Sequence, residues 1–289
     1  MDPVRAGGTV LPRAAATGIE ETSLEMTDDS QQPKNATPRR TGQRRGIYLL
    51  PNLFTTAALF AGFYGVVAAM NQRFEAAAAA IFVAMVLDGL DGRVARLTGT
   101  ESEFGVQYDS LSDMVSFGIA PALIMYEWTL RGMATLGWAP AKLGWVAAFA
   151  YAACAALRLA RFNSQRGGAD KRYFVGLPSP SAAALMMGLV WVGADMDAEG
   201  AFLMWIALVV TVGSAGLMVS NVLYLSFKDF HPRERIPFIA AAAIVLVFVL
   251  ASLDPPKVLF GGFLIYALSG VVLALVRKRR KAIRAARRD

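Results

Sequence analysis

The sequence predicts an all-α protein, a polytopic transmembrane bundle of about eight helices. Hydrophobic residues make up 55% of the 289 residues, and the mean hydropathy is positive. Several apolar runs reach the roughly 20 residues that a helix needs to cross a bilayer. Two of these runs contain acidic residues, which at membrane depth usually mark a functional site. A single soluble core is therefore excluded.

The chain divides into four segments by composition. Residues 1–45 are rich in Thr, Gln, Pro, Arg and small residues and lack the apolar core of a signal peptide, so we expect a disordered cytosolic tail. Residues 46–230 contain every motif described below and form the predicted main membrane domain. Residues 231–276 are expected to add two transmembrane helices, and residues 277–289 a basic cytosolic tail.

Eight apolar stretches are candidates for membrane spans. Their approximate bounds are 47–70, 75–97, 107–130, 143–163, 178–194, 202–224, 236–253 and 257–276. Cytosolic segments of membrane proteins carry an excess of Lys and Arg. Only Arg73, Arg131, Lys142 and Lys257, out of 29 Lys and Arg residues, fall on the side opposite the two termini. We therefore expect a multi-pass protein of the inner (cytoplasmic) membrane with both termini in the cytosol.

The net charge of +7 follows from these basic flanks. Lys and Arg beside apolar spans contact the anionic headgroups of membrane lipids. The charge therefore predicts membrane lipids as partners, and we expect no binding to nucleic acid.

An acidic motif occupies the shared end of the second and third predicted spans. It reads D-x-x-D-G-x-x-A-R, then eight residues, then G-x-x-x-D-x-x-x-D. Its specified positions are Asp88, Asp91, Gly92, Ala95, Arg96, Gly105, Asp109 and Asp113. On helices the first five fall within an arc of roughly 140°, and the last three form one stripe. A short polar loop, residues 98–103, would make the two helices antiparallel and bring the stripes face to face.

Four carboxylates in one low-dielectric pocket repel each other unless a cation compensates them. Oxygen ligands without His or Cys suit Mg²⁺, Mn²⁺ or Ca²⁺. The motif therefore predicts a divalent metal site, with room for two ions. The small residues Gly92, Ala95 and Gly105 leave space for a ligand or for close helix contact. Arg96, on the same face, could bind phosphate.

The motif resembles the signature of the CDP-alcohol phosphotransferase family, integral membrane enzymes of phospholipid synthesis, at all eight positions. The resemblance implies that Asp88, Asp91 and Asp109 bind a pair of divalent cations, Mg²⁺ or Mn²⁺. It implies that Asp113 both approaches the metals and serves as the catalytic base. It also implies a homodimer, the common state of family members.

The same resemblance assigns residues to the CDP-activated donor. Gly92, Gly105 and Arg96, with Ala95 between them, are expected to lie against its cytidine and phosphates. In the segment LPNLFT at 50–55, Asn52 and Thr55 are expected to border the nucleotide, although the Pro-Asn pair also suits an ordinary helix start.

Further segments resemble the phosphatidylserine synthase branch of this family: RLARFN at 158–163, the F-x-GLPSP pattern at 174–180 and LMVSN at 217–221. Arg158 and Arg161 lie one helical turn apart and present fork-shaped donors that suit a carboxylate or phosphate. With Asn163 they are the predicted binding residues for the acceptor alcohol.

The resemblance implies transfer of the phosphatidyl group from CDP-diacylglycerol to the hydroxyl of L-serine, with phosphatidylserine and CMP as products. Two alternatives stay open. Glycerol 3-phosphate or inositol 1-phosphate could replace serine, because a phosphate also suits the two arginines. A divalent-cation transporter is the alternative of another class, but Arg96 among the acids favours anions and hinders a cation path.

Overall fold

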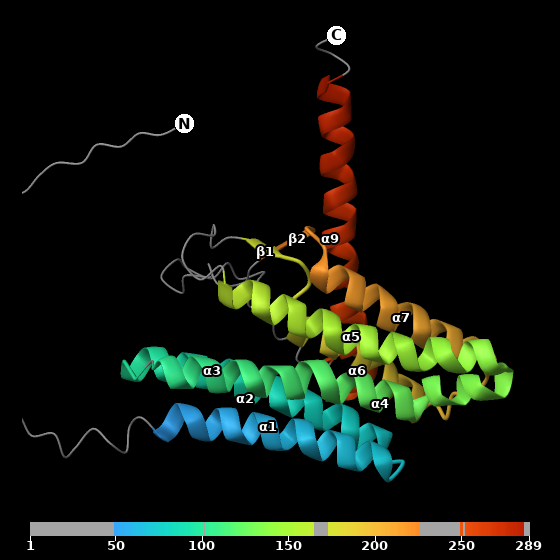
Figure 1. The fold of residues 1–289 in the computed structure, drawn as a ribbon, viewed down its shortest axis with the longest axis horizontal. Helices are drawn as coiled ribbons and strands as arrows, with labels where there is room; N and C mark the ends of the chain where they lie inside the picture. The colour runs from blue at the N-terminus through green and yellow to red at the C-terminus, as the bar shows by residue number, and fades with distance from the viewer. Residues whose placement is uncertain (1–48, 101, 165–172, 226–248, 251, 286–289) are drawn as a thin grey trace, which may run out of the picture. The chain divides into compact units, whose positions relative to one another are not determined.

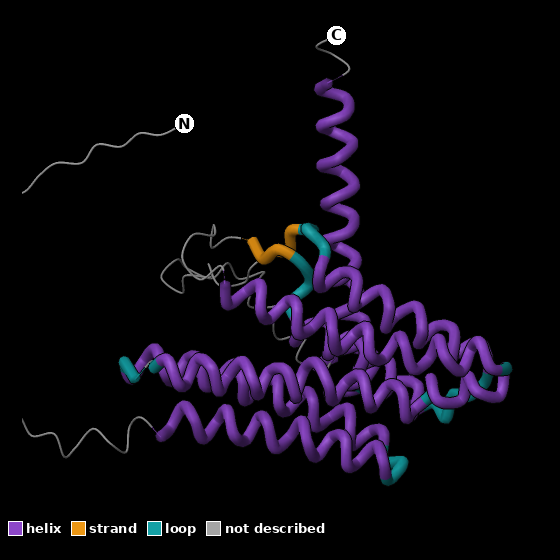
Figure 2. Tube along the Cα trace, in the orientation of Figure 1, coloured by secondary structure: helices purple, strands orange, loops and turns teal. Residues whose placement is uncertain are grey.

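The computed structural model describes residues 49–100, 102–164, 173–225, 249–250 and 252–285. All of them belong to one contact unit, Gly42–Asp289, and most are helical (Figures 1 and 2). The elements in chain order are α1 (Leu49–Met70), α2 (Phe74–Thr98), α3 (Glu103–Asp113), the π-helix η1 (Met114–Ile119), α4 (Ala120–Trp128), the 3₁₀-helix η2 (Leu130–Leu136), α5 (Trp138–Ser164), β1 (Tyr173–Val175), α6 (Ser179–Asp195), α7 (Ala201–Val219), β2 (Leu223–Leu225) and α9 (Pro255–Ala285).

Four of the described helices are long and apolar enough to cross a membrane, which agrees with a membrane helical protein. They are Pro51–Met70 in α1, Trp138–Ser164 in α5, Ala201–Val219 in α7 and Pro255–Arg279 in α9. The predicted span 75–97 coincides with α2, whose apolar character is interrupted by the motif acids. The predicted span 236–253 lies mostly outside the described residues. A total of eight spans therefore stays a prediction.

The third predicted span is one run of helix that changes its winding. Residues 103–128 pass from α3 through η1 into α4 without a break, and π-helical turns of this kind often lie at functional sites. Two serines attach this run to α1: Ser112 Oγ donates to Thr55 O at 3.1 Å, and Ser116 Oγ donates to Ala58 O at 3.1 Å. These two bonds therefore fix the position of Asp113, the last residue of α3, along the axis of α1.

A small antiparallel sheet is the feature that the all-α prediction missed. Strand β1 pairs with β2 in the register Tyr173↔Leu225 to Val175↔Leu223. The predicted span 202–224 was too long, because α7 ends at Val219 and Ser220 is extended. The pairing joins segments about fifty residues apart in the sequence, and helical periodicity cannot reveal such a contact.

Gly176 makes the turn from β1 towards α6 possible. Its φ of +81° lies in the left-handed region, and a Cβ there would collide with the carbonyl oxygen of Met218. Its N–H donates to Val222 O at 2.8 Å. Glycine is needed here because it alone combines this backbone conformation with such a close approach.

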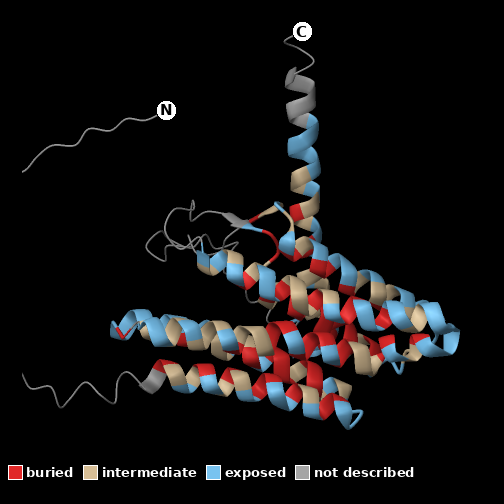
Figure 3. Cartoon of the chain, in the orientation of Figure 1, coloured by how far each residue is buried: buried red, intermediate tan, exposed pale blue. Residues whose placement is uncertain are grey.

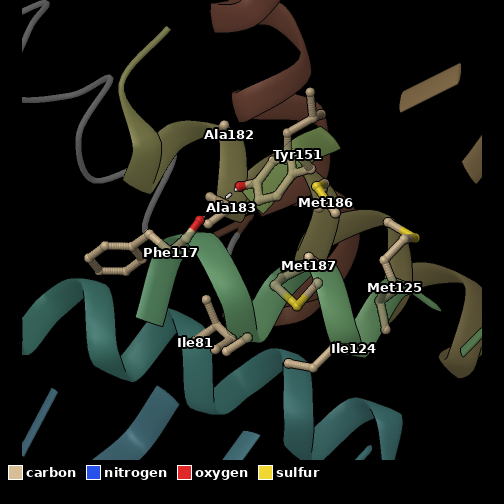
Figure 4. Packing of buried hydrophobic residues seen from close by; sticks show 14 of the residues in the cluster. Ile81, Phe117, Ile124, Met125, Tyr151, Ala182, Ala183, Met186 and Met187 are labelled. Carbon is tan, nitrogen blue, oxygen red and sulfur yellow. Dashed lines mark hydrogen bonds between the residues drawn. The ribbon is translucent and has the colours of Figure 1, made fainter. Parts of the chain in front are cut away.

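Buried residues concentrate where the helices face each other (Figure 3). Ile81 of α2, Ile124 and Met125 of α4 and Met187 of α6 pack together in the core (Figure 4). Large apolar side chains also cover the outer surface, for example Phe60 and Phe149, which are 68% and 63% exposed. Exposed apolar surface of this extent suits contact with lipid.

Candidate active site

Three of the four motif aspartates meet between α2 and α3. One carboxylate oxygen from each of Asp88, Asp91 and Asp109 lies within 4.8 Å of the other two. The predicted loop produces this meeting: Gly99 ends α2 in the left-handed conformation, and Ser102 caps α3 by accepting the N–H of Gly105 at 3.0 Å. The convergence of the two acidic stripes is thus confirmed.

The fourth aspartate lies next to this trio, one turn deeper in the bundle. The carboxyl group of Asp113 is hydrogen-bonded to that of Asp88. Its Oδ1 is buried and has no hydrogen-bond partner among the described residues. Asp113 therefore presents an oxygen to the interior of the site while its other side contacts the group of acids.

Helix α1 orients the most buried of the acids. Asp91 is 5% exposed, and its Oδ2 lies 2.7 Å from the hydroxyl of Thr55, which is 4% exposed. The same hydroxyl lies 3.1 Å from the carbonyl oxygen of Pro51. Thr55 therefore fixes the carboxylate of Asp91, a role that sequence reasoning missed, whereas its contact with a nucleotide stays a prediction.

The other residues predicted to bind the donor lie on α1, α2 and α3, the same three helices that carry the acids and Thr55. A Cβ added at Gly92 would meet nothing within 4 Å, so this glycine leaves open space rather than a helix contact. Ala95 is half-buried, and the exposed Arg96 donates from Nε to Gly92 O at 2.8 Å. A Cβ at Gly105 would lie 3.6 Å from Asn52 Oδ1. The fold thus brings Asn52 of α1 to the start of α3.

A second contact between α1 and α3 was not predicted from the sequence. The hydroxyl groups of Thr56 and Tyr108 lie 2.9 Å apart. Thr56 follows Thr55 in the sequence, and Tyr108 precedes Asp109. This adjacency to predicted site residues was the only hint in the sequence, and it does not identify the contact until the relative positions of α1 and α3 are known.

Arg158 of α5 reaches the same interior. Its guanidinium NH1 donates to Ser179 Oγ at 2.7 Å. Its Nε is buried and lacks a hydrogen-bond partner within the described part of the chain. The guanidinium also lies within electrostatic range of Asp113. A half-buried cation whose buried Nε lacks a partner in the described part of the chain is suited to bind a small anionic group.

The other two predicted acceptor-binding residues also bond to protein groups, and their contact with an acceptor stays a prediction. Arg161 NH2 donates to Asn221 Oδ1 at 2.9 Å, and Asn163 Nδ2 donates to Ser110 Oγ at 3.0 Å. Ser110 directly follows Asp109, the third metal-ligand candidate, along α3. These bonds attach the C-terminal end of α5 to α3 and to the segment after α7, so both residues support the shape of the site.

A cavity of about 550 Å³ lies at the opposite end of α1 and α2. Its lining includes Arg73, Glu75, Trp128, Asp197 and Glu199. None of the motif residues borders it, so size alone does not indicate the active site here.

Residues 48–213 match the family model described as CDP-alcohol phosphatidyltransferase, which covers more than half of the chain. The chain belongs to this family. A relative from Helicobacter pylori strain J99, named CDP-diacylglycerol--serine O-phosphatidyltransferase, is 35% identical over 237 residues, 80% of this chain and 94% of the relative. A Mycobacterium leprae relative of the same name is 33% identical, with 74% and 70% covered. An archaetidylserine synthase from Methanothermobacter thermautotrophicus is 31% identical, with 61% and 69% covered.

The CDP-alcohol phosphatidyltransferase family depends in general on divalent metal ions. The acids of this chain fit such ions, because Asp88, Asp91 and Asp109 offer only carboxylate oxygens within a span suited to one small cation. Asp113 lies outside this group of three, although its carboxyl group contacts that of Asp88. A hard divalent cation is therefore the expected cofactor class.

Proposed function

We propose that this phosphatidyltransferase transfers the phosphatidyl group of CDP-diacylglycerol to the hydroxyl of L-serine. The observation that carries the proposal is the half-buried Arg158, whose Nε is buried without a hydrogen-bond partner among the described residues and whose guanidinium interacts electrostatically with Asp113. Serine brings a carboxylate for the arginine and a hydroxyl for the aspartate. The relatives named for phosphatidyl transfer to serine support this acceptor.

Each site residue has a separate role in the proposed reaction. Arg158 binds the serine carboxylate and turns the hydroxyl towards Asp113, which accepts the proton. The serine oxygen then forms a bond to the phosphorus that carries diacylglycerol, and the bond from this phosphorus to the CMP oxygen breaks. Arg96 stabilises the charge that develops on the departing CMP. Asn52, Gly92, Ala95 and Gly105 border the donor.

The metal centre would be formed by Asp88, Asp91 and Asp109, with Asp113 adjacent. We propose Mg²⁺ or Mn²⁺ and a pair of ions, which would supply neutralisation of the diphosphate charge. Thr55 supports this centre by holding Asp91 in one orientation.

We further propose an inner-membrane location with both termini and the active site at the cytosolic surface. The acids, the start of α1 and the basic end of α5 lie at one end of the helices, and the distribution of Lys and Arg supports a cytosolic position for that end. The proposed catalytic domain, 46–230, contains the matched family region, 48–213, and extends beyond it at both ends. A homodimer is proposed on the family resemblance.

The test is CMP release by the purified chain from CDP-diacylglycerol with Mg²⁺ or Mn²⁺. Serine, glycerol 3-phosphate, inositol 1-phosphate and choline are supplied one at a time. Release that only serine stimulates, and that EDTA abolishes, is the expected result. Stimulation by another alcohol would keep the metal-dependent chemistry and refute serine as the acceptor. No release with any acceptor, together with Mn²⁺ uptake into liposomes that contain the chain, would support the transporter instead.

A further inference from the structure

The cavity of about 550 Å³ at the far end of α1 and α2 has the size of a small-molecule site. It lies where the apolar span of α1 ends at Met70 and that of α7 begins at Ala201. The motif acids lie near the other end of α1, where Thr55 contacts Asp91. Because the 20-residue span of α1 is about 30 Å long, the cavity lies at the membrane surface opposite the aspartates.

Specific contacts hold the walls of this cavity together. Gln72, in the turn between α1 and α2, donates from Nε2 to Glu127 Oε1 of α4 at 3.4 Å. Arg131 NH1 donates to the same oxygen at 2.7 Å. A Cβ added at Gly193 of α6 would collide with the Trp128 ring, so the indole packs directly on that helix. The cavity is therefore bounded by elements that are bonded and packed to each other.

The lining carries charges of both signs on exposed side chains. Arg73 contributes one positive charge, and three carboxylates come from Glu75, Asp197 and Glu199. Within the described residues, none of these four side chains takes part in a salt bridge or a side-chain hydrogen bond. The described part of the chain thus leaves these charges to a ligand.

The three carboxylates of the cavity do not form a metal site. In the described part of the chain, the group of acids whose ligand atoms converge closely enough for one metal ion is Asp88, Asp91 and Asp109. The cavity acids do not converge in this way, so they suit a larger cation. A primary ammonium group has three N–H donors and can bond to more than one carboxylate. Arg73, in the same cavity, suits a phosphate.

We propose that this cavity binds the headgroup of a membrane lipid that combines a phosphate with a primary ammonium group, as in phosphatidylethanolamine. Arg73 binds the phosphate, and the carboxylates bind the ammonium. The place of the cavity at the ends of two spans favours a lipid over a soluble molecule, as does Trp128 in its lining, since Trp is enriched at membrane surfaces. Three negative charges against one positive charge disfavour a purely anionic headgroup. The inference goes beyond the proposed function, because none of the motif residues borders the cavity.

The thermal midpoint of the purified chain in detergent tests the inference, because a ligand that binds the folded state stabilises it. Phosphatidylethanolamine, phosphatidylcholine and phosphatidylglycerol with the same acyl chains are titrated separately. Phosphatidylethanolamine should raise the midpoint by about 3 °C at ten times its Kd. The other two should have little effect, because the choline ammonium has no N–H donor and the glycerol headgroup has no ammonium. O-phosphoethanolamine, which lacks the acyl chains, should give no shift at the same concentration.

The double variant Asp197→Asn/Glu199→Gln removes two carboxylates of the cavity. Asn also adopts the left-handed conformation that position 197 requires, with its φ of +47°. The half-saturating concentration of phosphatidylethanolamine should rise about tenfold or more. Glu75→Gln, on α2, makes the same test if the double variant does not fold. Asp195→Asn is the matched control: it neutralises an exposed acid that does not line the cavity, so it should leave the titration unchanged.

Three results would overturn the inference. Equal midpoint shifts with the three lipids would show that the headgroup is not recognised. A shift specific to phosphatidylethanolamine that the double variant and Glu75→Gln retain would place the binding elsewhere. An equal shift with O-phosphoethanolamine would refute a lipid as the ligand. Failure of the proposed function appears separately, as CMP release that serine does not stimulate, and it leaves these midpoints unaffected.

Discussion

Thr55→Val should weaken metal activation without changing the fold. The substitution replaces a hydroxyl that lies 2.7 Å from Asp91 Oδ2 with a methyl group of similar size. A hydrogen bond to a charged group contributes about 1.5–3 kcal/mol. Loss of a group that orients a metal ligand usually costs about tenfold to hundredfold in metal affinity. We expect the Mn²⁺ concentration for half-maximal CMP release to rise by that factor.

The assay is a Mn²⁺ titration of CMP release at saturating CDP-diacylglycerol and serine. A parallel titration of the thermal midpoint measures metal binding without turnover, because a ligand that binds the folded state stabilises it. Thr55→Ser keeps the hydroxyl and should restore the wild-type curve. Thr56→Val removes the neighbouring contact with Tyr108 and should leave the metal titration unchanged. A wild-type titration in Thr55→Val would refute the argument that Thr55 positions Asp91.

Three further outcomes follow from the same geometry. Asp113→Asn should abolish turnover while CDP-diacylglycerol binding persists in part, and retained turnover would exclude Asp113 as the base. Arg158→Ala should raise the KM for serine about tenfold or more, and that for CDP-diacylglycerol far less; equal rises would place Arg158 on the donor phosphates. Gly176→Ala should lower the thermal midpoint by at least about 2 °C, because it forces a side chain into a left-handed conformation beside Met218. Gly213→Ala, where a Cβ meets nothing within 4 Å, is its control, and equal midpoints in the two variants would contradict the strain argument.

The spacing of the aspartates was sufficient to predict their meeting. Asp88 and Asp91 share one face of a helix, Asp109 and Asp113 share another, and a loop of a few residues allows only an antiparallel return. Donor chemistry then gave the metal class, since carboxylates without His or Cys select hard cations. These inferences needed only the residue types of the motif and their spacing along each helix.

The contacts that hold the aspartates were not predictable in the same way. Thr55 and Asp91 are 36 positions apart, and Arg158 and Ser179 are 21 apart. Each pair forms at only one relative rotation and axial offset of two packed helices. The sequence of either helix alone does not specify that rotation or offset. The same reason explains why β1 and β2 were missed, since strand pairing is a property of two segments rather than one.

The sequence by itself determined that this is a helical membrane protein with a metal-binding motif of the CDP-alcohol phosphatidyltransferase family. Composition, span length and motif spacing are properties of single segments, so they can be read without a structure. The tertiary structure alone decided that Thr55 holds Asp91 and that Arg158 of α5 bonds to Ser179 of α6. Those relations arise from packing between distant helices, where the buried polar groups must find partners from elsewhere in the chain.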